Sequence, residues 1–124
     1  MTASRDAVVA AASRAAAREL APRYGTQALA DVETVLSSSR ESEPPSQFSD
    51  PVALGSLIVS IAGLAWQIYS DRKKQGEKPM KDAVGRAVRV ERRKYSDLTA
   101  AEERVIEIVS AEIVIRGDDE NQAQ

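Results

Sequence analysis

The 124-residue sequence contains no cysteine and no histidine, and only five of its residues are aromatic. Without cysteine the chain cannot form a disulfide scaffold, a thiolate metal site or a thiol nucleophile, and without histidine it lacks the commonest acid–base catalyst and zinc ligand. The few aromatic side chains leave little material to wall a pocket for a small molecule. We therefore expect no catalytic residues, no metal, no cofactor, no small-molecule substrate and no enzymatic activity.

Two pairs of carboxylates, Glu102/Glu103 and Asp118/Asp119, come nearest to an acid–base arrangement. We expect the first pair at a helix end and the second in a tail. Water reaches both places, and solvated carboxylates are not poised for catalysis. Neither pair is therefore predicted to be catalytic.

Charge is nearly balanced overall, at a formal net charge of −2, but it is unevenly distributed along the chain. Residues 71–94 contain ten basic and four acidic side chains, whereas residues 95–124 contain two basic and eight acidic ones. This polarity indicates either binding to a surface or partner, or two helices that fold back on each other and neutralise their charges.

The first 50 residues predict a marginal helical hairpin followed by a linker. Residues 3–21 are rich in alanine, the best helix former, and Pro22 is expected to end that helix. Residues 27–36 repeat Leu and Val at helical spacing and predict a second helix. The polar, Pro-containing stretch 37–50 is typical of a flexible linker.

The most informative segment is 52–69, VALGSLIVSIAGLAWQIY, which carries no charge. Asp50-Pro51 is a good helix start, and eighteen helical residues extend about 27 Å, close to the thickness of a bilayer core. Trp66 and Tyr69 precede the basic cluster Arg72-Lys73-Lys74, as at a membrane interface. The pattern favours a transmembrane helix within 51–74. The alternative is a buried helix in a soluble bundle. Against this alternative, the other helices have few large apolar side chains with which to surround the segment on all sides.

A stripe of small and polar residues follows one side of this helix. Its members lie four, three and four positions apart, and they are Ser56, Ser60, Gly63 and Gln67. In a bilayer such a seam lets a second helix approach closely, so it predicts self-association or docking to a membrane partner. Alternatively, the hydroxyls bond back to their own helix, and in a soluble bundle the seam would pack against helix 3–21.

Residues 80–95 predict a basic amphipathic helix. Met80, Ala83, Val84, Ala87 and Val88 share its apolar face. The opposite, basic face contains Arg86, Arg89, Arg92 and Arg93. This face would rest on anionic headgroups or be an ordinary solvated surface, while the alternation over 87–91 also fits a short strand. Nucleic acid is not favoured as a partner, because the acidic tail competes for the arginines and no aromatic is interleaved with them.

The last helix begins at the capping box Thr99-Ala-Ala-Glu102 and is expected to end at Gly117, followed by an acidic, frayed tail over 118–124. Its wide apolar stripe needs a partner: helix 80–95, the second N-terminal helix or another chain. We predict an apolar partner face at Val105, Ile106, Val109 and Ile113.

The segment from Asp50-Pro51 through LGSLIVSIAGLAWQIY to Lys74, with the two helices after it, resembles small helical proteins of bacteria, notably actinobacteria. The likeness covers residues 50–116 and brings no catalytic residues with it. It implies a helper or adaptor that acts near signalling or defence effectors.

Together these patterns predict an all-α chain of about five helices: a hairpin (1–36), a linker (37–50), a central apolar helix (51–74), a two-helix module (79–117) and a tail (118–124). The favoured function is a single-pass membrane adaptor, with the C-terminal half cytoplasmic because basic residues follow the span. The alternative is a cytoplasmic, soluble interaction or self-assembly module with 52–69 as its core. Both act through a protein partner or a homo-oligomer.

Overall fold

The computed structural model describes residues 5–38, 53–95 and 97–122, which form five α-helices and no strand. The helices are α1 (Arg5–Tyr24), α2 (Gln27–Ser38), α3 (Ala53–Lys74), α4 (Lys81–Arg93) and α5 (Ala100–Gln122). The predicted all-α fold of about five helices is therefore confirmed. Most of the predicted linker, and the helix start at Asp50-Pro51, lie outside the described residues.

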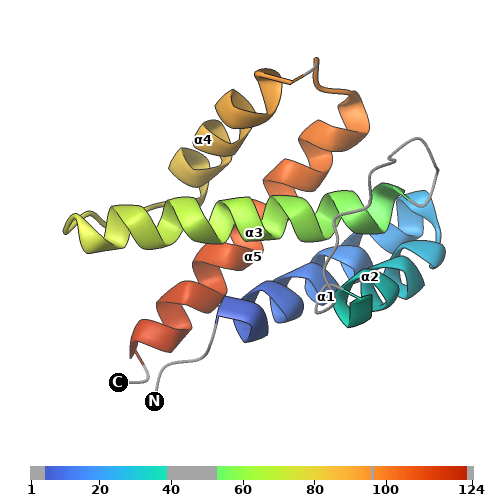
Figure 1. Ribbon diagram of the computed structural model, residues 1–124, viewed down its shortest axis with the longest axis horizontal. Coiled ribbons are helices and arrows are strands. Elements are labelled where there is room, and N and C mark those ends of the chain that lie inside the picture. Colours follow the sequence, from blue (N-terminus) through green and yellow to red (C-terminus); the bar gives the residue numbers. More distant parts are fainter. Residues whose placement is uncertain (1–4, 39–52, 96, 123–124) are drawn as a thin grey trace.

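Helix α3 is the central element of the bundle. It extends along the molecule, with α4 on one side, α1 and α2 on the other, and α5 crossing it (Figure 1). It contacts each of the other four described helices. Its buried positions recur at helical spacing and are Gly55, Ile58, Ile61, Ala62, Ala65 and Tyr69.

The alanine-rich helix α1 contributes more to the core than its composition suggests. It packs against α2, α3 and α5, and it buries Val8, Val9, Ala12, Ser13, Ala16, Ala17 and Leu20. Small side chains let neighbouring helices approach closely, and the Ile and Val side chains of α3 and α5 then fill the interior. The neighbouring helices therefore bury the side of α3 that carries Ile58 and Ile61 and leave the side that carries Ser60 and Gln67 exposed, so they surround α3 only in part.

Two helix ends differ from the sequence prediction. Pro22 does not end α1, although it lacks the N–H that would continue the helical hydrogen bonds. The helix ends two residues later, before Gly25, because Gly25 takes a left-handed φ of 96° and its N–H donates to the Ala21 carbonyl at 2.7 Å. Gly117 does not end α5, which continues to Gln122. Gly117 is buried in α5 against Tyr69. A Cβ at this position would lie 2.6 Å from the Tyr69 ring, so only glycine fits.

Two other helix ends depend on local interactions, and one of them is the predicted capping box. After α3, Gly76 takes a φ of 85°, and Gly76 and Glu77 donate to the carbonyls of Lys73 and Arg72. Before α5, the capping box is present: the Glu102 N–H donates to Thr99 Oγ1 at 3.0 Å, and the Thr99 N–H donates to Glu102 Oε1 at 3.4 Å.

None of the described helices is both long and apolar enough to cross a membrane. The predicted span over 52–69 therefore finds no support in this part of the chain. Tyr69, which the sequence placed at a membrane interface, is 1% exposed in the bundle core. Its hydroxyl donates to Asp118 Oδ1 of α5 at 2.7 Å, and its ring stacks on Trp66.

Candidate functional site: the groove between α3 and α4

The predicted apolar partner face belongs to the core of the chain itself. Val105, Ile106, Val109 and Ile113 are all 0% exposed. Helix α5 meets α1, α3 and α4, which together cover this stripe. The prediction that helix 80–95 covers this stripe is therefore confirmed, whereas the contacts with α1 and α3 were not predicted. The four residues leave no exposed surface for another chain.

The predicted seam on α3 lies toward solvent. Ser60 and Gln67 are exposed, and Ser56 and Gly63 are half-buried. The expectation that this stripe is the tight-packing face in a bundle is therefore wrong. Close packing falls instead to Gly55, where a Cβ would lie 2.3 Å from Asp31 Cβ of α2.

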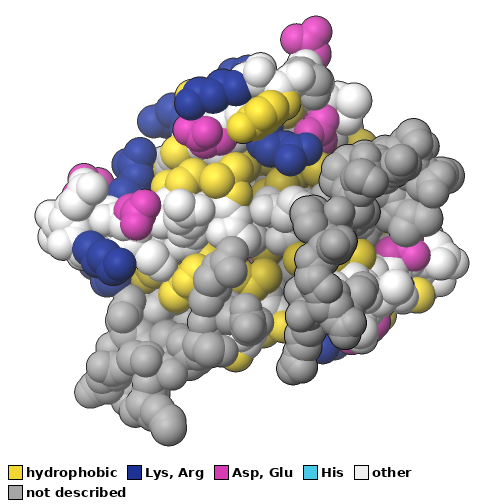
Figure 2. Space-filling model, viewed as in Figure 1, with side chains coloured by type: hydrophobic (Ala, Val, Ile, Leu, Met, Phe, Trp, Pro, Cys, Tyr) yellow, Lys and Arg dark blue, Asp and Glu magenta, His cyan; other side chains and the backbone are white. Residues whose placement is uncertain are grey.

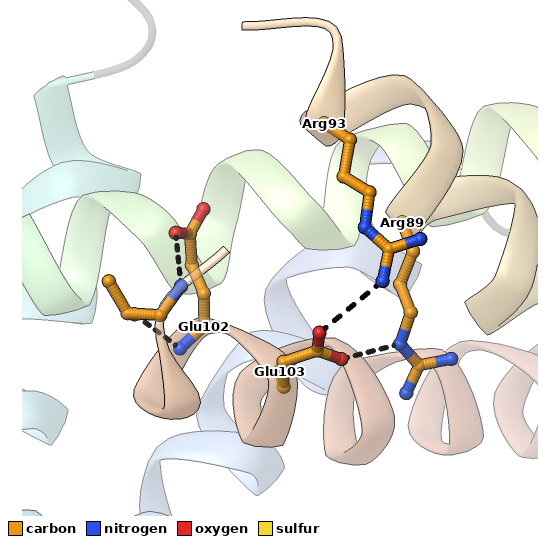
Figure 3. A network of polar contacts seen from close by, with 5 residues as sticks. Arg89, Arg93, Glu102 and Glu103 are labelled. Atoms are coloured by element: carbon orange, nitrogen blue, oxygen red, sulfur yellow. Dashed lines mark hydrogen bonds and ion pairs between the residues drawn. The ribbon is translucent and has the colours of Figure 1, made fainter. Parts of the chain in front are cut away.

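Most of the predicted basic face on α4 is engaged by the acidic start of α5 (Figure 3). Arg89 Nε lies 2.8 Å and Arg93 Nη2 lies 3.6 Å from the Glu103 carboxylate, and Arg92 Nη2 lies 2.9 Å from Glu102 Oε2. The two helices thus pair their opposite charges, which was one of the two interpretations of the charge pattern. Arg86 is the member of the basic face that has no ion pair within the described residues.

Three carboxylates of the two pairs considered in the sequence, Glu102, Glu103 and Asp118, make contacts that stabilise the fold. Glu102 caps α5, and both glutamates bind arginines of α4. Asp118 accepts the hydrogen bond from Tyr69. The side chain of Asp119 lies outside the described residues. In the described part of the chain, no group of three acidic side chains is arranged to hold a metal ion.

An open groove of about 580 Å³ lies between α3 and α4. Ile68 of α3 and Ala83, Ala87 and Val90 of α4 give it an apolar lining. Val90 is 52% exposed, so the lining is open to solvent. Figure 2 shows apolar side chains along this boundary, beside the basic side chains of α4.

Charged residues of both signs edge the groove: Asp71, Arg72, Glu77, Arg86 and Glu91. Arg72 pairs with Glu77 at 3.7 Å, and Glu91 pairs with Lys94 at 3.1 Å. The sequence placed Ala83 and Ala87 on the apolar face of helix 80–95 but did not show that this face is only partly covered. Ile68 and Asp71 were missed, because their position in the groove depends on how α4 returns along α3.

A second hollow, of about 370 Å³, has a mainly charged lining that includes Glu19, Lys81, Asp82 and Glu107. A hydrogen bond with Glu112 of α5, together with burial and charge repulsion, raises the pKa of Glu19 above its ordinary value. This hollow is smaller and exposes less apolar surface than the α3–α4 groove. The α3–α4 groove is therefore the stronger candidate site.

Comparisons with protein-family models, with curated proteins and with solved structures give no match to this chain. The resemblance to small actinobacterial helical proteins, and the helper role that it implies, stay predictions.

Proposed function

We propose that this chain is a non-enzymatic helical interaction module, and that it binds a helical face of a protein partner in the groove between α3 and α4. The observation that carries the proposal is the solvent-open apolar lining of that groove, formed by Ile68, Ala83, Ala87 and Val90. Two adjacent helices form a groove into which a third helix can pack, because its side chains fit between theirs.

The rest of the apolar surface supports this choice. The stripe on α5 is covered within the chain, whereas α4 buries Val84 and Val88 and leaves Val90 in the open groove. A mixed-charge edge around an apolar centre is the usual anatomy of a protein interface. The groove therefore has the composition expected of a docking site.

The absence of enzymatic activity is part of the proposal. The carboxylates that come nearest to an acid–base pair, Glu102 and Glu103, are committed to arginines and to the helix cap. A lipid-facing role for α3 has less support, because Ile58, Ile61 and Tyr69 are buried among the other helices. The soluble-module alternative of the sequence analysis is thus the function that we favour.

Site-specific photo-crosslinking tests this proposal. A benzophenone amino acid replaces Val90 in the full-length chain expressed in its native host, and the matched control replaces Ile115 of α5. The two side chains are exposed to similar extents, 52% and 55%, but Ile115 is not part of the groove. We expect one discrete adduct from position 90 and none from position 115.

A second change ties the adduct to the groove. Ala87→Glu places a carboxylate on the apolar lining and should abolish the adduct, while circular dichroism shows that the helices remain. No adduct from position 90, or an adduct that survives Ala87→Glu in a folded chain, would contradict the proposed function. The mass of the adduct identifies the partner.

A further inference from the structure

Two opposite charges on the groove walls have no ion-pair partner among the described residues. Asp71 of α3 and Arg86 of α4 both line the groove, and both side chains are exposed. Neither makes an ion pair or a side-chain hydrogen bond with any described residue. The neighbouring groove residues Arg72 and Glu91 already form ion pairs within the chain. The next two arginines along α4, Arg89 and Arg92, are paired with glutamates of α5.

Unpaired surface charges are ordinary while water solvates them. These two lie beside an apolar lining, however, so a helix seated in the groove would remove part of their water. A docked partner therefore has to offer a cation to Asp71 and an anion to Arg86, because a buried charge without a partner weakens binding. A partner face of one sign would satisfy one of them and repel the other.

We infer that the partner is a second copy of this chain, seated groove to groove about a two-fold axis; this inference rests on the proposed function. In such an interface, when residue i contacts residue j of the partner, residue j also contacts residue i of the partner. Arg86 of one copy then meets Asp71 of the other, and the same contact forms again on the opposite side. Both charges are satisfied together, and the two apolar linings, including Ile68 and Val90, cover each other.

The net charge of the chain suits this arrangement. At −2 per copy, long-range repulsion between two copies is small. The ten basic side chains of residues 71–94 would otherwise repel each other when two copies meet, but Arg89, Arg92 and Arg93 are already paired with two glutamates of α5.

Charge reversal provides a test that a different partner cannot imitate. We measure the molar mass of the full-length chain without detergent by sedimentation over a range of concentrations, for the wild type, Arg86→Asp and Asp71→Arg. Each substitution puts like charges at both contacts of the dimer and should weaken self-association by at least about tenfold in Kd. A mixture of the two variants restores an opposite pair at both contacts, so we expect mixed dimers from two chains that each self-associate only weakly.

Lys81→Asp is the matched control. It makes the same change of charge on the same helix, its side chain does not line this groove, and an acidic residue suits the first turn of a helix. We expect it to dimerise like the wild type. Circular dichroism checks that each variant is folded.

Three results would overturn the inference: a wild-type chain that stays monomeric at every concentration, single variants that dimerise as well as the wild type, or folded single variants that form no mixed dimer. An adduct from position 90 to a different protein would also overturn it, while leaving the proposed function intact. An adduct of twice the chain mass, together with mixed dimers, supports both.

Discussion

Helix α3 meets its neighbours in two different ways. Toward α2 and α5 the packing is so close that a Cβ on Gly55 would lie 2.3 Å from Asp31 Cβ, and one on Gly117 would lie 2.6 Å from the Tyr69 ring. Toward α4 the same helix leaves a groove of about 580 Å³. The close contacts define how the chain folds, whereas the side toward α4 keeps apolar surface exposed to solvent.

The largest effect is expected where α5 closes the core. Ile113 is 0% exposed and Ile115, two positions along the same helix, is 55% exposed. Ile113→Ala should lower the free energy of unfolding by about 2–5 kcal/mol, through lost burial and the cavity left behind. Ile115→Ala should change it by less than about 0.5 kcal/mol. Urea unfolding followed by circular dichroism measures both, and equal effects would mean that the α5 stripe is not the core of this chain.

Replacing two helical glycines by alanine compares the close α2–α3 contact at Gly55 with the looser surroundings of Gly85. Gly55→Ala forces the backbones of α2 and α3 apart and should destabilise the fold by about 1–3 kcal/mol. At Gly85 of α4 the nearest atoms to a Cβ lie 3.5 Å and 3.6 Å away, so the methyl group fits.

Gly85→Ala should therefore stabilise the fold by about 0.5–1 kcal/mol, because alanine is the better helix former. Thermal unfolding of the two variants side by side measures the difference. If both substitutions destabilise the fold, or if neither does, the packing at Gly55 is not closer than the packing at Gly85.

Much of this fold could be predicted from local sequence patterns. The helix over 27–36 and the capping box at Thr99 depend on neighbours in the chain, and both are present. The function of Gly117 could not be predicted, because the residue that makes a glycine necessary there, Tyr69, lies 48 positions earlier. A buried glycine and a helix-ending glycine are alike in sequence.

The groove shows the same limit. Helical spacing placed Ala83 and Ala87 on an apolar face, and sequence alone does not tell which part of that face α3 and α5 will cover. Conversely, the seam at Ser60 and Gln67 was predicted as a contact surface and lies exposed, because the larger Ile58 and Ile61 bury more apolar area when α3 turns them inward.

The smallest effects are expected from two glutamates at contacts of α1. The hydrogen bond with Glu112, then burial and repulsion, raise the pKa of Glu19, so the folded chain holds this proton more tightly than the unfolded chain. Its stabilising contribution is complete below the ordinary pKa of 4.5 and is lost as pH rises through the folded value. Glu19→Gln should therefore stabilise the fold at pH 7 and lose this advantage in acid.

Glu33 is the matched opposite case. Its hydrogen bond with Arg14, which also donates from Nη2 at 3.1 Å, lowers the pKa of Glu33. Its contribution is present above 4.5 and is lost as pH falls through the folded value, so Glu33→Gln should destabilise the fold at pH 7 and become neutral in acid. Unfolding midpoints between pH 3 and pH 7 test the pair, and effects of the same sign would contradict these contacts.

Helix α3 is the buried core of the bundle, with one face left toward solvent. Because the chain has no cysteine, a single introduced thiol reports on one position. Ser60 is exposed and Ala62, two residues later, is 0% exposed. We measure the alkylation rates of Ser60→Cys and Ala62→Cys in the full-length chain without detergent. We expect position 60 to react at least about 100-fold faster, because position 62 is reached only when the fold opens. Equal rates at the two positions, whether both fast or both slow, would contradict it.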